Sequence, residues 1–328
     1  MDHLIVIGSN SFSGAHFVDY ALEQGLSVIG ISRSPEPHPV FLPYKKRKDA
    51  AFRFHQCDIN HDLAGIMALI DDFRPDYLVN FAAQSMVAES WQNPGHWFQT
   101  NVVSTVKLHE ELRKLPFLKK YVHVSTPEVY GTCEGLVRET TNYCPSTPYA
   151  VSRAAADMSL MSYFKAYDFP VVFTRAANVY GAGQQLYRII PRTVLFFLTG
   201  QTLSLHGGGT SVRSFIHIRD VADATLRIAR QAPPGEIYHI STTRNISIRA
   251  LVEVIARQLG VNFESRVRIV GERLGKDAAY LLDNSKLRET LGWQDRISLE
   301  EGIEEAIAWV RDNLEILKQL PVDYVHKP

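Results

Sequence analysis

The residues between His123 and Arg153 are of types that could transfer protons. Tyr149 and Arg153 lie four residues apart at the start of an expected helix, so their side chains share one face. A phenol beside a fixed cation has a stabilised phenolate and can accept a proton near neutral pH. Glu128 offers a second acid or base nearby. The segment therefore predicts an active site. The alternative is an ordinary helix-surface pair of Tyr149 and Arg153, with Glu128 in a solvated loop.

A glycine-rich turn near the start of the chain predicts a phosphate-binding site. The apolar run over 4–7 is typical of a strand buried in a parallel sheet, and an amphipathic stretch follows Gly14. Backbone N–H groups at the start of such a helix face a phosphate. The spacing from Gly8 to Gly14 is that of a dinucleotide fingerprint, with Ser11 in place of the middle glycine. A plain strand-to-helix turn is the alternative.

The residues after the second expected strand, 27–31, favour NADP over NAD. A NAD-binding chain typically places an acidic residue here for the ribose hydroxyls, but this chain has Ser32 and Arg33. A guanidinium and hydroxyls suit a 2′-phosphate. The alternative is that Arg33 is a loop cation away from the ribose. We expect residues 33–51, which include four prolines and a basic cluster, to form an exposed loop.

Strand and helix patterns alternate through the first half of the chain. The strand expected over 52–56 leads into Asp58, which could contact an adenine, and the strand over 77–81 leads into Ala82 and Ala83, small residues that let a cofactor approach the backbone. A helix over 97–115 then returns to a strand over 121–124. This alternation predicts an α/β fold with a doubly wound parallel sheet and ligands at the carboxyl ends of its strands.

The length of 328 residues predicts more than one compact unit. We expect a dinucleotide-binding domain over 1–188 and a smaller C-terminal α/β substrate lobe, mainly over 189–328, from which some strands return to the first sheet. Arg188, Arg213 and Arg273 are candidates for gripping an anionic substrate, because guanidinium forks match phosphate oxygens. A surface ion pair is the alternative for each. Further helices are expected near 219–231, 248–259 and 299–318.

Composition and charge argue against several other classes of protein. The 35 basic and 35 acidic side chains balance, so general attraction to nucleic acid or a membrane surface is not indicated. Cys57, Cys133 and Cys144 lack the paired spacing of a zinc site, which predicts no metal and a reduced, cytoplasmic setting. No cationic leader and no apolar run of about 18 residues occur, so we expect neither a secretion signal nor a membrane span.

A series of short motifs extends over nearly the whole chain in a fixed order. They are Gly-x-x-x-Phe-x-Gly (8–14), Asp58, Ala-Ala-Gln-Ser (82–85), Thr-Asn-Val-Val (100–103), Ser-Thr-Pro-Glu-Val-Tyr-Gly (125–131), Tyr-x-x-x-Arg (149–153), Asn-Val-Tyr-Gly (178–181), Arg-Ser-Phe-Ile-His-Ile-Arg-Asp (213–220) and the segment 283–293. In this order they resemble the extended short-chain dehydrogenase/reductases. The segment over 125–131 and the turn over 272–277 are most similar to the nucleotide-sugar 4,6-dehydratases of the dTDP-glucose and GDP-mannose types.

The resemblance implies a Rossmann-type domain with NAD or NADP, a lobe for a nucleoside-diphosphate hexose, and a homodimer formed through helices. The implied cofactor contacts are Gly8, Asn10, Ser11, Phe12, Gly14, Ser32, Arg33, Asp58, Ile59, Phe81, Ala82, Ala83, Asn101, Ser125, Tyr149 and Arg153. The implied substrate contacts are Ser85, Thr126, Glu128, Asn178, Arg188, Arg213 and Arg273.

The resemblance also implies roles for four catalytic residues. Thr126 would bind the sugar 4-hydroxyl, and Tyr149 would take its proton as hydride leaves C4 for the nicotinamide. Glu128 would then remove the C5 proton, water would leave from C6, and the hydride would return to C6. Arg153 would stand in for the family lysine. The implied product is a 4-keto-6-deoxy sugar.

Three positions depart from the family pattern. Pro127 replaces an aspartate that protonates the leaving hydroxyl in the dTDP-glucose type, so Glu128 or a water must be the acid, or the reaction differs. Arg153 has a larger head than lysine and is expected to lie less deeply. Met86 stands where histidine is common. The alternatives are a nucleotide-sugar epimerase, decarboxylase or 4-keto reductase of the same family, or a binding protein with little catalysis.

Overall fold

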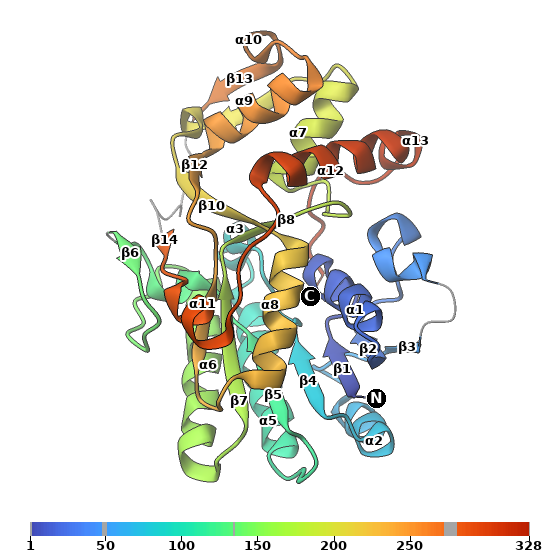
Figure 1. Cartoon of the computed structure of the whole chain (residues 1–328), viewed down its shortest axis with the longest axis vertical. Helices are drawn as coiled ribbons and strands as arrows, with labels where there is room; N and C mark the ends of the chain where they lie inside the picture. Colours follow the sequence, from blue (N-terminus) through green and yellow to red (C-terminus); the bar gives the residue numbers. More distant parts are fainter. Residues whose placement is uncertain (1, 48–50, 134, 272–280, 328) are drawn as a thin grey trace.

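A seven-stranded parallel sheet forms the lower part of the molecule, and a smaller group of helices and short strands forms the upper part (Figure 1). The computed structural model describes residues 2–47, 51–133, 135–271 and 281–327. The strand order is β11-β7-β5-β4-β1-β2-β3. These strands are β1 (His3–Ile7), β2 (Ser27–Ser32), β3 (Phe52–Gln56), β4 (Tyr77–Asn80), β5 (Lys120–Val124), β7 (Val171–Ala176) and β11 (Ile237–Ile240). The predicted doubly wound parallel sheet is confirmed.

The order of the strands reverses between β1 and β4. From β1 the chain builds outward to β2 and β3, whereas β4, β5 and β7 follow one another on the other side. A reversal of this kind leaves a crevice at the carboxyl ends of the two central strands. Gly8 ends β1 with φ of 84°, and a Cβ added there would lie 2.7 Å from the Ala82 backbone nitrogen beyond β4. The close approach of these two backbones requires a glycine.

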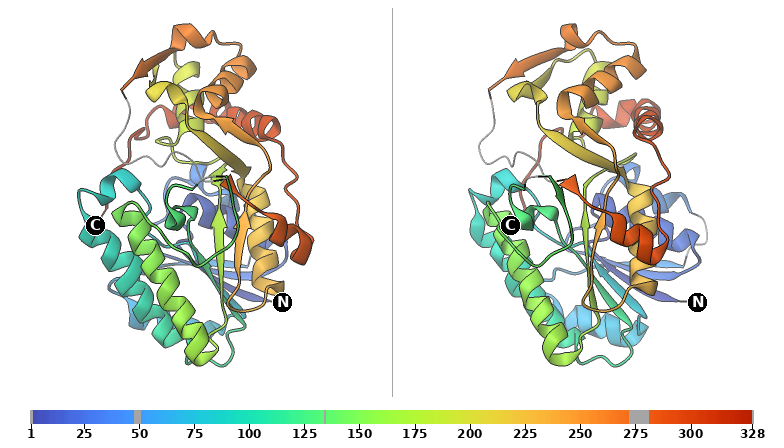
Figure 2. Two further views of the ribbon diagram at one scale, coloured as in Figure 1. Left: turned by 90° about the vertical axis from the view of Figure 1, so that its left-hand side faces the viewer. Right: turned by 60° about the vertical axis from the view of Figure 1, so that its left-hand side comes forward.

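Helices cover both faces of the sheet (Figure 2). Leu4 and Val6 of β1 pack in a core with α1 (Phe12–Glu23) and α8 (Ile218–Gln231). The alternate residues Ile5 and Ile7 pack in a second core with α2 (Leu63–Phe73), α5 (Thr105–Leu112) and α6 (Pro148–Tyr167). Burial on both faces explains why the sequence of β1 is continuously apolar. No described helix is long and apolar enough to cross a membrane.

The helix expected over 97–115 is divided into three pieces. It begins as α4 (Pro94–Phe98), passes through a π-helical segment, η3 (Gln99–Ser104), and continues as α5. Short π-helical segments often occur at functional sites. Here the segment carries Asn101, whose side chain is fully buried. The neighbouring α3 (Val87–Ser90) is a single short turn.

The upper part has its own apolar core. Its helices are α7 (Ile189–Leu198), α9 (Ile248–Leu259), α10 (Phe263–Arg266), α12 (Leu299–Asp312) and α13 (Leu314–Leu317). Its strands are β8 (Asn178–Tyr180), β10 (Val212–His217) and β12 (Asn245–Ser247) in one sheet, and β9 (Leu203–His206) and β13 (Val267–Val270) in another. The helix expected over 299–318 is therefore two helices that meet at Asn313.

Segments of the C-terminal half also complete the lower part. β11 is an edge strand of the large sheet, and α8 and α11 (Ser285–Leu291) pack on the same core as α1. A small pairing joins β6 (Leu136–Val137) to β14 (Leu281–Leu282). The chain thus crosses between the two parts several times, and the boundary at residue 188 stays a prediction.

The expectation of an exposed loop over 33–51 is wrong for part of that segment. The described residues contain two 3-10 turns, η1 (Pro39–Phe41) and η2 (Pro43–Lys46). Leu42 and Tyr44 are buried in the core that contains α1. Arg47 from the basic cluster pairs with Asp19 of α1 at 2.5 Å. Apolar side chains between the prolines fix this segment onto the helix.

Replacing Gly14 with alanine tests how closely α1 approaches β1. The added Cβ would lie 2.2 Å from the Gly8 carbonyl oxygen, so the helix must move away from the turn. We expect Gly14→Ala to lower the free energy of unfolding in urea by about 1–3 kcal/mol. Gly65→Ala in α2 is the matched control, because no atom lies within 4 Å of its added Cβ. We expect the control to change stability by about 1 kcal/mol or less, in the stabilising direction. Equal stability of both variants would contradict the close approach.

Candidate active site

A cleft of about 890 Å³ lies at the carboxyl ends of the sheet strands, between the lower and upper parts. It brings together many of the predicted site residues from distant parts of the chain. Those that line it are Ser11, Phe12, Phe81, Ala83, Ser85, Ser125, Thr126, Glu128, Tyr149, Arg153, Asn178, Arg188 and Arg213. Arg273 lies outside the described residues.

The remaining predicted cofactor residues, except Asn101 of η3, lie around the turns that follow β1, β2, β3 and β4. The Asn10 backbone N–H donates to Ser32 Oγ at 3.0 Å, and its side-chain amide donates to the Ser34 carbonyl at 2.9 Å. These bonds hold the glycine turn against the end of β2. Asp58 accepts from the Asn60 N–H at 2.8 Å, so its carboxylate holds its own loop, and Ile59 beside it is buried.

The start of α1 has the features expected of a phosphate-binding turn. Ser11 caps the helix, because its Oγ accepts from the Gly14 N–H at 3.0 Å. The same hydroxyl donates to the Gly8 carbonyl at 2.7 Å. Ser11 thus closes the turn with its side chain where the usual fingerprint has a glycine, and the first N–H groups of the helix remain at the cleft.

Asn101 positions the loop after β4. Its side chain donates to the Gln84 carbonyl at 3.0 Å and accepts from the Gln84 N–H at 2.9 Å. It also donates to Ser152 Oγ of α6 at 2.9 Å. These three bonds occupy the buried amide, which does not line the cleft. The predicted contact of Asn101 with a cofactor therefore becomes an indirect one, through the backbone of the loop over 82–85.

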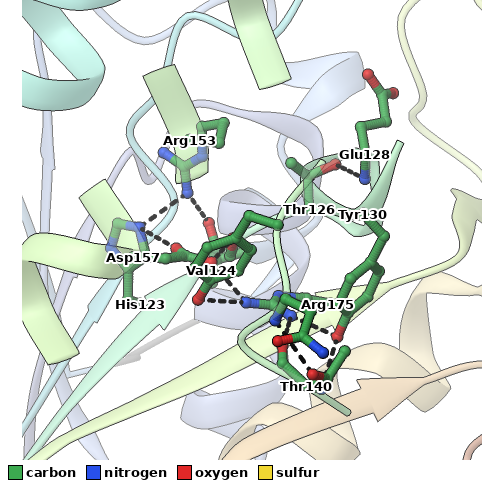
Figure 3. A network of polar contacts seen from close by, with 12 residues as sticks. His123, Val124, Thr126, Glu128, Tyr130, Thr140, Arg153, Asp157 and Arg175 are labelled. Carbon is green, nitrogen blue, oxygen red and sulfur yellow. Dashed lines mark hydrogen bonds and ion pairs between the residues drawn. The ribbon is translucent and has the colours of Figure 1, made fainter. Parts of the chain in front are cut away.

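Thr126 and Pro127 form the turn that presents Glu128. Thr126 caps the 3-10 turn η4 (Pro127–Tyr130), since its Oγ1 accepts from the Glu128 N–H at 3.3 Å. Pro127 occupies the first position of the turn, where its fixed φ suits the geometry and no N–H is needed. Figure 3 shows the Glu128 carboxylate directed away from the buried arginines. Pro127 has no proton to give, but it begins the turn that places Glu128 in the wall of the cleft.

Tyr149 is buried, with 8% of its surface exposed, and it shares a side-chain hydrogen bond with Thr126. Burial raises the pKa of its hydroxyl above the ordinary value of 10, and the charge of Glu128 raises it further. Arg153 and Thr126 lower that pKa, but they do not reverse the shift. Arg153 thus stabilises the phenolate as expected, but burial and Glu128 outweigh it, and the net pKa of Tyr149 is raised. The alternative of an exposed surface pair is wrong.

Arg153 lies deeper than expected, with 1% of its surface exposed. Its Nη2 donates to the Val124 carbonyl and lies 3.1 Å from His123 Nε2 (Figure 3). Burial lowers the pKa of His123 well below its usual value, and the charge of Arg153 adds to this, so the imidazole is neutral. The buried Nη1 of Arg153 finds no acceptor among the described residues, although the side chain lines the cleft. A buried donor of this kind suits a ribose hydroxyl.

A polar network beneath Tyr149 was not predicted from the sequence. Asp157 accepts from Ser125 Oγ at 2.7 Å and from Arg175 Nη2 at 2.9 Å (Figure 3). Arg175 also donates to the Tyr130 hydroxyl. Asp157 and Arg175 have no exposed side-chain surface. The signal was present, because Tyr149, Arg153 and Asp157 follow one another at intervals of four on a single face of α6.

Basic and polar side chains from the upper part line the other side of the cleft. The Asn178 side chain donates to the Ser214 carbonyl at 3.2 Å, and the Arg213 guanidinium donates to the Val212 carbonyl at 2.9 Å. Arg188 lies beside the ring of Tyr187. Arg192, one turn further along α7, also lines the cleft and was not predicted. Among the described residues, no group of three or more His, Cys, Asp or Glu side chains could hold a metal ion.

Comparison with known proteins assigns the family. Residues 5–306 match the family described as GDP-mannose 4,6 dehydratase. A dTDP-glucose 4,6-dehydratase of Xanthomonas campestris pv. campestris is 32% identical in an alignment of 327 residues that covers 94% of this chain and 93% of that protein. The chain therefore belongs to the GDP-mannose 4,6 dehydratase family, and the resemblance to nucleotide-sugar 4,6-dehydratases is confirmed.

Solved structures agree with this assignment. The dTDP-glucose 4,6-dehydratase DesIV of Streptomyces venezuelae, with NAD and TDP bound, has a TM-score of 0.88 at 31% identity, over 96% of this chain and 98% of that chain. The UDP-glucose 4-epimerase of Thermotoga maritima, with UDP-glucose, has a TM-score of 0.86 at 27% identity, over 95% of this chain and 99% of that chain. The predicted Rossmann-type fold and the predicted class of nucleotide-sugar dehydratases that use a nicotinamide cofactor are confirmed.

Replacing Asp157 with asparagine tests the network beneath Tyr149. The change leaves the buried guanidinium of Arg175 without its carboxylate partner, so we expect a loss of about 3 kcal/mol or more in the free energy of unfolding. Glu315→Gln is the control, because Glu315 is 79% exposed and pairs with Lys318 on the surface. Its effect should stay below about 1 kcal/mol. Urea denaturation measures both variants. If Asp157→Asn loses less stability than Glu315→Gln, the network does not have this structural role.

Proposed function

We propose that this protein is an NAD(P)-dependent 4,6-dehydratase of a nucleoside-diphosphate hexose. The observation that carries the proposal is the common position of Thr126, Glu128 and Tyr149 on one wall of the cleft. Tyr149 bonds to Thr126 and experiences the charge of Glu128. Tyr149 can therefore accept a proton from a hydroxyl, Glu128 can accept one from a carbon atom, and both side chains face the same part of the cleft. The family and the dehydratase relatives support the same activity.

Tyr149 serves the oxidation of C4. It accepts the proton of the sugar 4-hydroxyl, while Thr126 holds the same oxygen in place through its hydroxyl. A nicotinamide bound in the cleft would supply the acceptor for the C4 hydride and the donor of the hydride that C6 receives. The buried Nη1 of Arg153 donates to the ribose of the cofactor and keeps a positive charge beside Tyr149. This charge lowers the pKa of Tyr149 against the effect of burial and so assists its role as a base.

Glu128 serves the elimination. A carbonyl at C4 acidifies the C5 proton, which the Glu128 carboxylate removes. The protonated carboxyl can then pass that proton to the C6 hydroxyl, which leaves as water, and C5 takes a new proton from solvent when the hydride returns to C6. One residue thus acts first as base and then as acid, which removes the need for a proton donor at Pro127. The half-buried Glu128 side chain lines the cleft and can reach both carbons.

Arginines of the upper part bind the diphosphate of the substrate. Arg188, Arg192 and Arg213 line the same cleft from α7 and β10. Guanidinium groups match the oxygens of a diphosphate in pairs. Asn178 adds an amide next to them. Arg273 stays a candidate from the sequence.

NADP is the cofactor that the end of β2 favours. DesIV and other structural neighbours bind NAD, but Arg33 follows β2 where the ribose 2′ position lies in a doubly wound sheet. A guanidinium at that place suits a 2′-phosphate.

The protein is further proposed to act as a homodimer through its helices. Val103 of η3 and Met158 of α6 are 41% and 59% exposed. Apolar side chains on these neighbouring helices suit contact with a second copy. A cytoplasmic location stays a prediction.

Epimerisation at C4 is the second candidate, because the Thermotoga maritima epimerase has nearly the same fold. An epimerase needs the oxidation of C4 but no proton transfer at C5. Glu128 beside Tyr149 therefore favours dehydration. Loss of water distinguishes the two reactions.

The decisive experiment incubates the purified protein with UDP-, dTDP-, GDP- and CDP-hexoses in deuterated water. We expect one of them to give a product lighter by one water and labelled at C5. Tyr149→Phe should abolish turnover while nucleotide binding stays within about threefold, because only the proton acceptor is lost. If each hexose keeps its water and its C5 hydrogen, the dehydratase assignment fails. A changed configuration at C4 without loss of water would establish the epimerase instead.

Replacing Glu128 with glutamine separates the two halves of the reaction. Turnover should fall by about 100-fold or more, while C4 oxidation still proceeds and the absorbance of reduced nicotinamide accumulates. Glu128 raises the pKa of Tyr149, so its removal lowers that pKa. The oxidation rate increases with pH as Tyr149 loses its proton. In Glu128→Gln this increase should therefore occur at lower pH than in the wild type.

Glu128→Asp is the control for the charge. It keeps a carboxylate near Tyr149, so its oxidation rate should rise at nearly the same pH as in the wild type. Single-turnover absorbance across a range of pH measures all three proteins. Normal product release by Glu128→Gln, or a rise displaced to higher pH, would contradict the assignment.

A further inference from the structure

The turn η4 directs one side chain into the cleft and another into the interior of the protein. Glu128 lines the cleft, whereas Tyr130, two residues later, is buried and is not among the described residues that line it. Figure 3 shows the Glu128 carboxylate and the Tyr130 hydroxyl pointing in opposite directions from the turn. A single 3-10 turn is too short to keep its shape by its own hydrogen bonds alone. The position of Glu128 therefore depends on what holds the turn.

Side chains hold the turn at both of its ends. Thr126 caps the start. At the end, Val129 and Tyr130 pack in a small apolar cluster with Ala154 of α6 and Leu282 of β14. Apolar contacts have no preferred direction, so the polar contacts of the Tyr130 hydroxyl decide where its ring lies.

The Tyr130 hydroxyl uses its full capacity for hydrogen bonds. It accepts from Arg175 and, at 3.4 Å, from the Thr140 N–H. It also lies 2.7 Å from Nε2 of His239, a residue of the edge strand β11. A hydroxyl has two lone pairs and one proton. Since the first two contacts occupy the lone pairs, the contact with His239 takes the proton.

The surroundings of His239 agree with this direction. Its Nδ1 lies 3.0 Å from the Asp283 carbonyl, which can only accept, so Nδ1 carries a proton. Burial, assisted by the charge of Arg175, lowers the pKa of His239 to about 3, so the imidazole is neutral. Its Nε2 therefore has no proton and accepts from the Tyr130 hydroxyl. This bond ties the end of η4 to the large sheet.

Arg175 does not depend on Tyr130 to keep its position. Its Nη1 also donates to the Thr140 carbonyl at 3.0 Å, and its Nη2 donates to Asp157 at 2.9 Å and to the Tyr143 hydroxyl at 3.0 Å. If the Tyr130 hydroxyl is removed, the guanidinium keeps these three partners while the end of η4 loses its polar anchor. The effect should therefore fall on the turn rather than on the network beneath it.

We propose that Tyr130, held by His239, is the positioning residue that keeps Glu128 in place for the elimination. This inference rests on the proposed function, in which Glu128 takes the C5 proton and gives it to the C6 hydroxyl. Both transfers require the carboxylate at a fixed distance from two neighbouring carbons, and a misplacement of about 1 Å can cost a reaction about 100-fold. Oxidation at C4 does not use the carboxylate, so it tolerates movement at the end of the turn.

Tyr130→Phe tests this role, and Tyr143→Phe is the matched control. Both substitutions remove a phenol hydroxyl that bonds to Arg175, but only Tyr130 belongs to η4. Each protein receives whichever of the UDP-, dTDP-, GDP- and CDP-hexoses the wild type dehydrates. The absorbance of reduced nicotinamide and the mass of the product are followed through a single turnover.

We expect the two steps of the reaction to separate in Tyr130→Phe. Oxidation at C4 should stay within about threefold of the wild-type rate, whereas loss of water should slow by about 10- to 100-fold, so reduced nicotinamide accumulates. Tyr143→Phe should keep both rates within about threefold of the wild type.

His239→Asn removes the acceptor of the Tyr130 proton. The new amide can still donate to the Asp283 carbonyl, but it has no atom at the place of Nε2. This variant should also slow the loss of water more than the oxidation. Because both substitutions break the same hydrogen bond, the double variant should be no slower than Tyr130→Phe alone. Additive effects of the two substitutions would contradict a shared bond.

A purely structural role would give a different result. Loss of stability slows oxidation and loss of water by the same factor, and circular dichroism measures whether each variant is folded. Equal slowing of the two steps, or the same separation in Tyr143→Phe, would overturn the proposal. If the wild type loses no water from any hexose, the dehydratase assignment fails and the role of Tyr130 fails with it. If the wild type loses water and Tyr130→Phe keeps the wild-type ratio of the two rates, only the role of Tyr130 fails.

Discussion

The site depends on the buried ion pair of Arg175 with Asp157, to which His123 links the buried guanidinium of Arg153. Arg153 and Arg175 are at most 1% exposed, and Asp157 accepts from Arg175 at 2.9 Å. Removing one partner of such a buried arrangement costs about 3–5 kcal/mol. Because these residues come from α6 and β7, and Ser125 beyond β5 also bonds to Asp157, the interaction fixes the catalytic helix to two neighbouring strands. The position of Tyr149 follows from that attachment.

The same network sets the net charge next to Tyr149. His123 is neutral, so within the network two positive charges face one negative charge. The excess positive charge lies next to Tyr149, where it opposes the effects of burial and of Glu128 on the pKa of the phenol. An arginine in place of lysine therefore keeps the charge that a tyrosine base requires. Val124 and His123 accommodate the larger head of Arg153.

The sequence predicted the sheet, and most of the site residues that it predicted line the cleft, because local signals carry that information. Continuous apolar runs mark buried parallel strands, and the expected strand over 52–56 has the bounds of β3. The buried position of Arg153 depends on residues far from it in the sequence. The hydrogen bonds of Asn101 and the contact of Lys327 with Arg33 also join residues that are far apart in the chain. Their positions depend on how the elements pack, which periodicity and spacing do not contain. The net pKa shift of Tyr149 likewise depends on burial, which only the folded chain defines.

The two departures from the dTDP-glucose pattern within the site are consistent with one another. Pro127 removes a proton donor but starts the turn that Thr126 caps, and this turn holds Glu128 in the wall of the cleft. In the mechanism that we propose, a firmly placed Glu128 takes the C5 proton and gives it to the leaving hydroxyl without a second acid. Its charge, however, makes Tyr149 harder to deprotonate. Arg153 beside Tyr149 opposes that effect, so the carboxylate proposed for the elimination and the cation proposed to assist the oxidation shift the pKa of the same phenol in opposite directions.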